Sequence, residues 1–389
     1  MDKVGIIAAM ASTSPNVAFN AHLLAGGATY RSAGISVYIA GLLRHLGTTP
    51  DALRYHILLG DGDLPDGVTL PFTRSRFSTR DPRRRIVWEQ VMLPIVLRRL
   101  GADLCHGPAF AGALLTRCPQ VITIHDLSFL RHPEFFRRGN RTYLSLISRL
   151  SCRRAAGVIA VSDFTAREAM SLLALREKHV TTVYSGVAPR FRVLPEADVT
   201  HFRKIKGLPE RFILYLGTLE PRKNLARLVR SFALARDPDL HLVIAGGRGW
   251  AYDDVFEEVE RQSLGQAVHF AGYVPAGEQA LWYNAAHAFA YVSTYEGFGL
   301  PVLEALACGV PTVTSSTTSL LEAGGECVLA VSPDDDAEIA AALRRVTTDA
   351  DLRDRLRTGG LARVGTFSWE ETARRTEAVY QAVLNGSPA

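Results

Sequence analysis

Residues 291–304 read YVSTYEGFGLPVLE, and the local fold can be inferred from this stretch. The run HAFAYVS (287–293), which overlaps its start, is apolar and rich in residues that favour strands, so it predicts a buried parallel strand. Pro301 suits the first turn of a helix and Gly309 can end one, so LPVLEALAC (300–308) is the predicted helix. The stretch therefore predicts a strand, a loop that contains two glycines, and a helix.

Two carboxylates flank the predicted start of this helix. Glu296 lies in the strand-to-helix loop, and Glu304 lies in the first or second helical turn. The first amides of a helix lack intrahelical acceptors and bind phosphate well, and Gly297 and Gly299 allow a close backbone approach. This arrangement indicates a site for a sugar attached to a nucleotide. The plainer alternative is a surface loop followed by a helix with a solvent-facing glutamate.

The string EGFGLPVLEALACGVPTVTS (296–315) resembles the Glu-x7-Glu signature of the family 4 retaining glycosyltransferases, which have the GT-B fold. The resemblance implies an α/β protein with two Rossmann-like, doubly wound parallel-sheet domains that face a cleft. It also implies that Glu296 binds hydroxyls of the transferred sugar and that Glu304 binds ribose. The backbone amides that would bind the donor diphosphate belong to Gly297, Phe298, Gly299 and Leu300.

The size and charge of the chain fit two domains with different surfaces. Its 389 residues are 47% hydrophobic, which is ample for two cores. Residues 1–190 contain 24 Lys and Arg against 13 Asp and Glu, whereas residues 191–389 contain 20 against 26. The net charge of +5 therefore combines a basic first half with an acidic second half.

Several protein classes are excluded by composition and motifs. No window reaches the roughly 18 apolar residues of a membrane span, and the start, MDKVGIIAAMAS, has too short an apolar run for a secretory signal. Zinc-finger, RNP and helix-turn-helix patterns are absent from the sequence, so nucleic acid is not an expected partner. The cysteines form no CxxC pair, which predicts a reduced, cytoplasmic protein without structural zinc. They are Cys105, Cys118, Cys152, Cys308 and Cys327.

Apolar strand-like runs alternate with amphipathic stretches along the chain, which predicts parallel sheets with helices on both faces. The runs are VAFNAHLL (17–24), QVITIHDL (120–127), GVIAVS (157–162), RFILYLG (211–217), LHLVIAGG (240–247), AVHFAGYV (267–274), HAFAYVS and VPTVTS (310–315). Residues 1–13 are interpreted as an extension or an extra edge strand, because VAFNAHLL better matches the opening strand of the resembled family.

A break in the pattern at 185–210 contains prolines and charges and little periodicity, as a linker would. We therefore predict an acceptor-binding domain at 1–190 and a nucleotide-sugar-binding domain at 191–367, with these roles implied by the resemblance. Residues 368–389 are predicted to be a final helix.

That final helix has its own signals. Ser368 and Glu371 have capping-box spacing. The resemblance implies that the helix crosses back to brace the first domain. A single helical stripe holds Trp369, Ala373, Thr376, Val379, Tyr380 and Val383.

The motif GTLEPRKN (217–224) directly follows the predicted strand RFILYLG. A strand, a glycine and the basic pair Arg222 and Lys223 at the next helix start would aim cations at a diphosphate. An isolated basic pair is more often simply exposed. The string resembles the phosphate clamp of the family, in which Lys223 takes the lysine position. Thr218 stands where the family has arginine, which leaves open whether Arg222 compensates.

A glycine also lies at the start of the predicted helix in TYRSAGISVYIAGLLRHL (29–46). Without a Cβ at Gly34, a phosphate can approach the backbone amides. The segment resembles the glycine loop that covers the donor diphosphate in the family. The neighbouring Gly26-Gly27 is interpreted as part of a flexible loop, and a lone glycine at a helix start can equally be structural.

The segment ITIHDLSFLRHPEFF places His125 and Asp126 at the end of a first-domain strand. It resembles the HDL segment of the family, whose histidine faces the transferred sugar. His125 would then hydrogen-bond the sugar or the acceptor hydroxyl, and Asp126 would fix its tautomer or the loop. The alternative is a hydrogen-bonded structural histidine. His106 in DLCHGPAF is interpreted either as structural or as lining the acceptor side.

In the second half, GGRGW (246–250) and AGYVP (271–275) end successive predicted strands and could frame the nucleotide. On the resemblance alone, the backbone of Val274 is assigned to the base.

Two basic stretches, 81–100 and 136–154, are rich in arginine. In the first, Asp81 is a plausible cap and Pro82 suits the first helical turn. Solvated charges on core helices are one interpretation. Docking of the basic first domain to an anionic membrane that carries a lipid-linked acceptor is the other.

The complete interpretation is a retaining, metal-independent hexosyltransferase of surface polysaccharide biosynthesis, without a cofactor, at the inner face of the plasma membrane. Its catalytic residues would be Glu296, Lys223 and His125, and its acceptor a saccharide or lipid-linked saccharide. The resemblance favours GDP-mannose as donor and leaves UDP-glucose, UDP-N-acetylglucosamine and dTDP-rhamnose open. A nucleotide-sugar epimerase with the same architecture is an alternative, whereas a nicotinamide dehydrogenase would need a GxGxxG motif that the chain lacks.

Overall fold

The computed structural model describes residues 14–24, 33–47, 53–76, 78–79, 81–136, 138–235 and 237–387. The predictions for residues 1–13 and for Gly26-Gly27 lie outside these residues.

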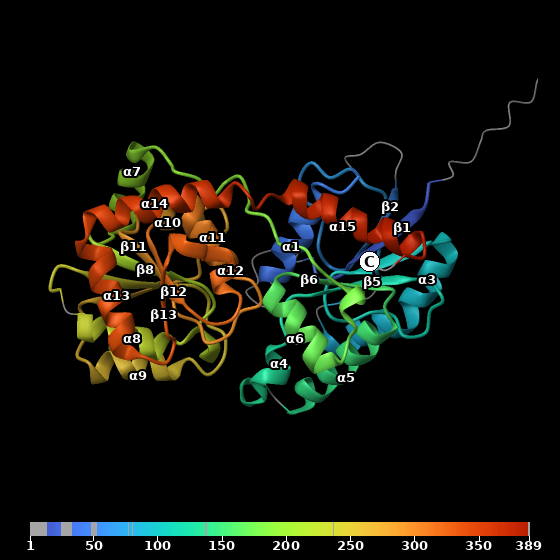
Figure 1. Cartoon of the computed structure of the whole chain (residues 1–389), viewed down its shortest axis with the longest axis horizontal. Helices are drawn as coiled ribbons and strands as arrows, with labels where there is room; N and C mark the ends of the chain where they lie inside the picture. The colour runs from blue at the N-terminus through green and yellow to red at the C-terminus, as the bar shows by residue number, and fades with distance from the viewer. Residues whose placement is uncertain are drawn as a thin grey trace, which may run out of the picture.

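Two parallel β-sheets, each flanked by helices, organise the described chain (Figure 1). The first sheet has the strand order β3-β2-β1-β4-β5-β6-β7, and the second has the order β10-β9-β8-β11-β12-β13. Every pair of neighbouring strands runs parallel. Both sheets therefore contain the Rossmann order, in which the chain reverses direction across the sheet between the first and fourth strands. The two doubly wound sheets expected from the sequence are confirmed.

The strands are short and mostly buried, as parallel strands covered on both faces must be. The first sheet consists of β1 (Asn16–Ala21), β2 (Arg54–Leu59), β3 (Phe72–Arg74), β4 (Leu104–Gly107), β5 (Gln120–Ile124), β6 (Gly157–Ala160) and β7 (Val180–Thr182). The second consists of β8 (Phe212–Leu216), β9 (His241–Ala245), β10 (Val268–Gly272), β11 (Ala288–Tyr291), β12 (Thr312–Ser315) and β13 (Leu329–Val331).

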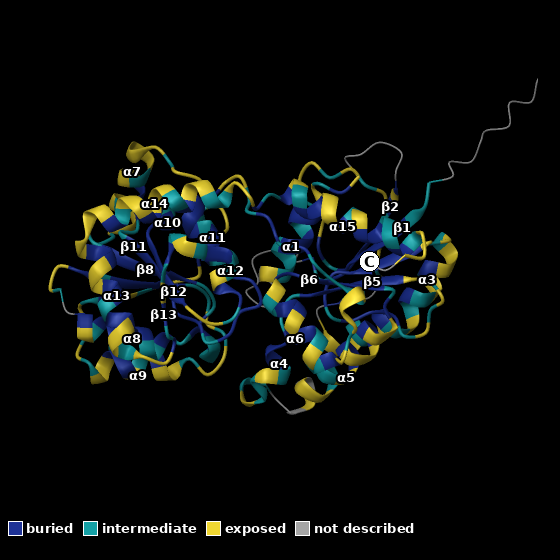
Figure 2. Ribbon diagram, viewed as in Figure 1, coloured by how far each residue is buried: buried dark blue, intermediate teal, exposed yellow. Residues whose placement is uncertain are grey.

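Helices cover both sheets with their buried faces inward (Figure 2). Around the first sheet they are α1 (Ala33–Leu43), α2 (Pro82–Val87), the π-helical segment η2 (Trp88–Met92), α3 (Leu93–Leu100), α4 (Ser128–Arg131), α5 (Arg138–Arg154) and α6 (Asp163–Leu173). The later helices are α7 (Glu196–Lys206), α8 (Leu225–Ala235), α9 (Asp253–Arg261), α10 (Gln279–Ala285), α11 (Leu300–Ala307), α12 (Leu320–Gly324), α13 (Asp336–Thr348), α14 (Ala350–Val364) and α15 (Trp369–Leu384).

The basic helix expected at 81–100 begins as predicted but is not uniform. The Asp81 side chain accepts hydrogen bonds from the amides of Arg83 and Arg84, so it is the helix cap. The π-helical segment η2 then separates α2 from α3 and turns Trp88 and Glu89 into the interior. The sequence does not predict this wider turn.

The final helix α15 crosses back to the first sheet, as the resemblance implied (Figure 1). The Ser368 hydroxyl accepts a hydrogen bond of 3.1 Å from the Glu371 amide, which confirms the predicted cap. All six residues of the predicted stripe are buried. The Glu377 carboxylate also accepts a hydrogen bond of 2.7 Å from the Tyr55 hydroxyl of β2.

The Trp369 ring holds α15 against α1. A Cβ on Gly41 would lie 2.3 Å from this ring, so only glycine allows the observed contact. Trp369 itself is 3% exposed. The indole is therefore enclosed and packs directly against α1.

We expect Trp369→Ala to lower the free energy of unfolding by about 3–5 kcal/mol, because it leaves a large cavity beneath α15. Denaturant unfolding followed by circular dichroism would measure the loss. Trp250→Ala is the matched control, since Trp250 is 42% exposed and its removal opens a much smaller cavity. Equal losses in both variants would contradict a bracing role for α15.

Candidate functional site

Four charged side chains gather at the carboxyl ends of β8 and β11. Glu220, Arg222 and Lys223 follow β8 in a loop that ends in a short 3-10 turn, Pro221–Lys223. Glu296 follows β11. These two strands are neighbours at the point where the chain order reverses across the sheet, which is where ligands of such folds bind. We call the four residues the ion quartet.

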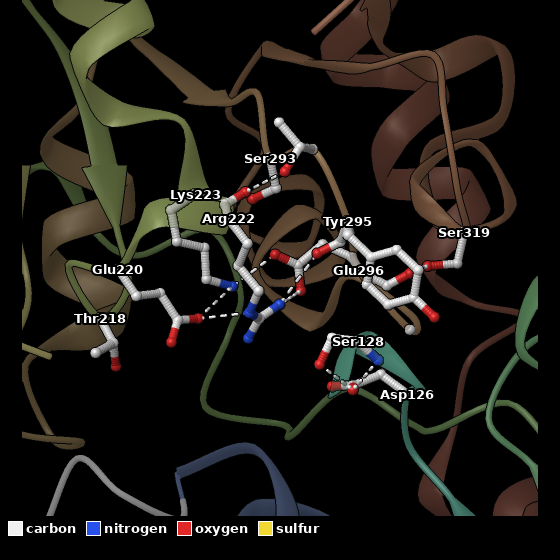
Figure 3. Close-up of polar contacts among 12 residues, drawn as sticks. Asp126, Ser128, Thr218, Glu220, Arg222, Lys223, Ser293, Tyr295, Glu296 and Ser319 are labelled. Carbon is white, nitrogen blue, oxygen red and sulfur yellow. Dashed lines mark hydrogen bonds and ion pairs between the residues drawn. The ribbon is translucent and has the colours of Figure 1, made fainter. Parts of the chain in front are cut away.

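Glu296 is the centre of the quartet, because each of its oxygens meets a different cation (Figure 3). Oε1 lies 2.6 Å from Lys223 Nζ, and Oε2 lies 2.8 Å from Arg222 Nη1. Arg222 Nε lies 2.6 Å from Glu220 Oε1, and Lys223 also donates a hydrogen bond of 2.6 Å to the Tyr291 hydroxyl. Two carboxylates thus balance two cations.

Burial and charge oppose each other in this cluster. Burial alone would raise the pKa of Glu296, but the charges of Arg222 and Lys223 outweigh it and lower that pKa to about 2. Burial and the neighbouring Arg222 lower the pKa of Lys223, against the attraction of the two carboxylates. Glu296 is therefore ionised at neutral pH and can accept hydrogen bonds but cannot donate a proton.

The loop after Glu296 touches the first domain. A Cβ on Gly297 would lie 1.7 Å from the His125 carbonyl oxygen, so a side chain is excluded at this position. The Gly297 carbonyl accepts hydrogen bonds of 2.6 Å from the Ser162 hydroxyl and 2.9 Å from the Thr165 hydroxyl. Gly297 thus lets two backbones meet between the domains.

The remaining loop residues lead into α11. Gly299 is its N-cap with φ of 104°, a left-handed conformation that favours glycine. The ring of Phe298 stacks on Tyr184 with centroids 5.7 Å apart. Leu300 is the first residue of α11, and Glu304 lies in the second turn, within the range predicted from the sequence.

Glu304 has a different environment from Glu296. Its Oε2 accepts a hydrogen bond of 3.0 Å from the Tyr283 hydroxyl. Burial raises the pKa of Glu304 to about 7, opposed by Arg190 and by the Tyr283 hydrogen bond. The two glutamates of the signature therefore differ in protonation at neutral pH.

His125 and Asp126 lie across the interface from the quartet, and Asp126 appears beside it in Figure 3. His125 Nε2 lies 2.7 Å from the Pro108 carbonyl oxygen. A carbonyl only accepts, so Nε2 carries the proton and Nδ1 is the acceptor nitrogen. Asp126 instead accepts hydrogen bonds from the amide and hydroxyl of Ser128. Pro108, not Asp126, fixes the tautomer, and Asp126 fixes the loop.

His106 and Gly34 both belong to the first domain. His106 belongs to β4 and is fully buried, where Nδ1 meets the Tyr380 hydroxyl of α15 and Nε2 lies 2.8 Å from the Thr123 hydroxyl of β5. Burial, and then His125, lower the pKa of His106 to about 3. We therefore assign His106 to structure rather than to the acceptor side. Gly34 is the exposed second residue of α1, and a Cβ there would meet nothing within 4 Å.

Thr218 follows β8 and Val274 follows β10, two strands of the second sheet that are separated by β9. The Thr218 carbonyl accepts a hydrogen bond of 3.0 Å from the Tyr215 hydroxyl. Arg222, not a residue at position 218, supplies the guanidinium of the quartet. Val274 is 4% exposed and packs in the core of the second domain.

Sequence reasoning missed several partners in this site. Glu220 lies within the quoted GTLEPRKN motif, and its position two residues before Arg222 was an available signal. In the sequence, Tyr291 and Tyr283 are indistinguishable from other core aromatic residues. Only the fold brings the Tyr291 hydroxyl to Lys223 and the Tyr283 hydroxyl to Glu304. Arg190 lies in the predicted linker, where no sequence pattern indicates that its charge acts on Glu304.

Family comparisons agree with this geometry. Residues 32–191 match a model described as Glycosyltransferase Family 4, and residues 198–363 match one described as Glycosyl transferases group 1. The O-antigen chain mannosyltransferase B of Escherichia coli is 34% identical over 284 residues, which are 71% of this chain and 73% of that protein. The chain belongs to the family 4 glycosyltransferases.

Other relatives of this glycosyltransferase are more distant. The D-inositol 3-phosphate glycosyltransferase of a Nocardioides species is 31% identical over 58% of this chain and 53% of its own length. The Escherichia coli serotype-specific mannosyltransferase WbdA is 29% identical over 69% of this chain, which spans about a third (34%) of that longer protein.

Solved structures share the complete architecture. Sucrose-phosphate synthase from Thermosynechococcus elongatus matches with a TM-score of 0.74 and 22% identity over 96% of this chain and 100% of its own. Anabaena HepE in complex with UDP and glucose matches with a TM-score of 0.75 and 18% identity over 95% of this chain and 100% of its own. These likenesses identify the fold as GT-B.

No described helix combines the length and apolarity that crossing a membrane requires. Within the same residues, no three His, Cys, Asp or Glu side chains gather as metal ligands would.

We expect Gly297→Ala to destabilise the contact between the domains, because its Cβ would overlap the His125 carbonyl. Overpacking of this kind costs about 1–3 kcal/mol, which thermal unfolding would measure. Gly277→Ala is the control, since a Cβ at Gly277 meets nothing within 4 Å. A Gly297→Ala variant as stable as the control would show that the domains do not meet here in solution.

Proposed function

We propose that this glycosyltransferase moves a mannosyl group from GDP-mannose to a hydroxyl of a saccharide or lipid-linked saccharide, with retention of anomeric configuration. The ion quartet at the strand ends carries the proposal. The mannose assignment rests on the relative named O-antigen chain mannosyltransferase B, which aligns with most of this chain.

The quartet suits a site that must accept a diphosphate. Its two carboxylates hold Arg222 and Lys223 in an ordered, overall neutral cluster. A bound diphosphate competes with Glu296 for these cations, which frees the Glu296 carboxylate to accept hydrogen bonds from sugar hydroxyls. Arg222 then supplies the second cation that Thr218 cannot.

Charge stabilisation of the departing diphosphate is the main catalytic effect in this proposal. Arg222, Lys223 and the amides at the start of α11 provide it, and the proposal gives no role to a metal. The acceptor oxygen bonds to the anomeric carbon as the bond from that carbon to the diphosphate breaks, and the acceptor proton passes to the diphosphate. Neither glutamate acts as a nucleophile. His125, with Nδ1 as acceptor nitrogen, positions a hydroxyl.

We expect GDP-mannose to give the largest thermal shift and the fastest turnover in a panel with UDP-glucose, UDP-N-acetylglucosamine and dTDP-rhamnose. Glu296→Ala should lower transfer by more than about tenfold, or roughly 1.4 kcal/mol in barrier. NMR of the product would show whether the anomeric configuration of the donor sugar is retained.

Asp63→Ala controls for loss of a carboxylate, because the Asp63 side chain is 84% exposed and pairs with Arg74 away from the quartet. Unchanged transfer by a folded Glu296→Ala variant would refute its role. Isomerisation of the donor without any acceptor would instead indicate an epimerase.

Donor affinity should depend on pH through Glu304. Its pKa is raised to about 7, so its carboxylate forms as pH rises through 7. Both oxygens of the carboxylate accept hydrogen bonds strongly from ribose hydroxyls, whereas one oxygen of the neutral acid carries a proton. Calorimetric titration of donor should therefore show about tenfold tighter binding at pH 8 than at pH 6. Glu304→Gln should remove this change and bind weakly at both pH values. An equal pH dependence in wild type and variant would contradict the ribose assignment.

A further inference from the structure

One helical stripe of the first domain exposes apolar side chains to solvent. Val87, Val91 and Ile95 are 49%, 54% and 42% exposed. They follow one another at four-residue spacing through α2, η2 and α3, which places them on one side of this continuous helical stretch. Trp88, Leu93 and Leu97 of the same stretch point into the core instead.

A second helix and a loop continue this apolar surface. On α5, Leu146 and Leu150 are 58% and 39% exposed, again four residues apart. Leu115, in the loop between β4 and β5, is 80% exposed.

Hydrogen bonds place that loop between the two helical stretches. The Gln90 side chain of η2 accepts a hydrogen bond of 3.1 Å from the Leu114 amide. The Ser151 hydroxyl of α5 accepts one of 3.0 Å from the Gly112 amide. The exposed apolar side chains therefore belong to adjacent elements.

These elements cover the same face of the first sheet. Leu93 and Leu97 pack with Ala18 and Cys105. Cys152 of α5 packs with Ile122 and Ile124 of β5, the strand next to β4. The opposite face of this sheet packs with α1 and α15. Figure 2 shows exposed turns along α3 and α5.

The segments that carry these apolar side chains are rich in arginine. The sequence of 138–154 contains no acidic residue, and 81–100 contains only Asp81 and Glu89. Asp81 caps α2, and Glu89 is buried with its Oε1 2.9 Å from His22 Nε2. The positive charge of this surface is therefore largely unopposed. The arginines are Arg83, Arg84, Arg85, Arg98, Arg99, Arg117, Arg141, Arg149, Arg153 and Arg154.

We propose that this surface, which we call the basic apolar face (81–100, 111–119 and 138–154), docks on an anionic lipid bilayer. Exposed valine, isoleucine and leucine side chains enter the boundary between headgroups and acyl chains, and the arginines contact lipid phosphates. The helices lie along the bilayer and do not cross it.

The combination of features favours a bilayer over other partners. A nucleic acid would engage the arginines but leave the apolar stripes in water. A second copy of the same face would bring like charges together. An anionic bilayer satisfies both the charge and the apolar groups over two helices and a loop.

Docking on a bilayer adds a partner to the proposed transferase and is independent of which donor sugar the enzyme uses. Vesicle binding needs neither donor nor acceptor, so failure of the proposed function would leave the result of the binding test intact.

The experiment is co-sedimentation of the full chain with vesicles of equal parts phosphatidylglycerol and phosphatidylcholine. We expect binding to these vesicles, weak binding to pure phosphatidylcholine, and release by high salt. The triple variant Val87→Ser, Val91→Ser and Ile95→Ser should lower the partition constant by about tenfold or more. Arg98→Gln with Arg99→Gln should weaken binding without touching the apolar stripe.

The control is the triple variant Ile205→Ser, Leu234→Ser and Leu361→Ser, which removes exposed apolar side chains from the second domain. It should bind like wild type, and thermal unfolding should show that all variants fold. Equal binding to neutral vesicles, or unchanged binding by the Val87, Val91 and Ile95 variant, would overturn the proposal. A third result would also overturn it: wild-type protein that forms dimers in sedimentation velocity but does not bind vesicles, with the dimers lost in this variant. The face would then be an interface between two copies of the chain.

Discussion

The carboxylate of Glu296 holds the second domain's strand ends together by bridging two cations that follow a different strand. Buried charges are costly unless they are paired, and here each oxygen of one carboxylate meets one cation. The loops after β8 and β11 must therefore keep one relative position. A backbone hydrogen bond of 2.8 Å, donated by the Thr294 amide to the Arg222 carbonyl, joins the same loops. The site is ordered before any ligand binds.

The same loop connects the charge cluster to the first domain. Gly297 follows Glu296 directly and meets the His125 backbone, so any shift of Glu296 acts on the interface. Farther along, the Glu322 carboxylate accepts hydrogen bonds from the Asp163 and Phe164 amides at the start of α6. A charge from the second domain thus caps a helix of the first and adds a contact between the domains.

Much of the fold was predictable because its signals are local. The apolar runs predict the central strands, and Asp81 and Ser368 indicate where two helices begin because both residues are N-caps. Partners set by long-range packing were not predictable. Tyr291 looks like any buried strand residue until the fold brings Lys223 to its hydroxyl. His106 has the same local appearance as a site histidine, and only α15, which begins more than 260 residues later, shows that it is enclosed.

The glycine at position 297 is compatible with two different close contacts, one with a ligand and one with another part of the protein. The sequence suggested a glycine that admits a ligand, and the structure shows that the backbone meeting it is the protein's own. Both ideas rest on the missing Cβ, so the sequence could not separate them. The ionisation states of the two glutamates are likewise set by neighbours, since Arg222 and Lys223 act on Glu296, while burial dominates at Glu304.

The chain crosses between the domains twice, and the two crossings lie together. The Val187 amide donates a hydrogen bond of 3.0 Å to the Phe367 carbonyl, and a Cβ on Gly186 would lie 2.3 Å from the Trp369 nitrogen. Opening of the contact at Gly297 would therefore require backbone rotation at these two crossings, because in the described part of the chain they are the covalent links between the sheets. Arg190 belongs to the first crossing and lowers the pKa of Glu304 against burial. Arg190 lies over the Phe191 ring, and Phe191 packs edge-to-face on Tyr283, the hydrogen-bond partner of Glu304, so this crossing is anchored to the surroundings of Glu304.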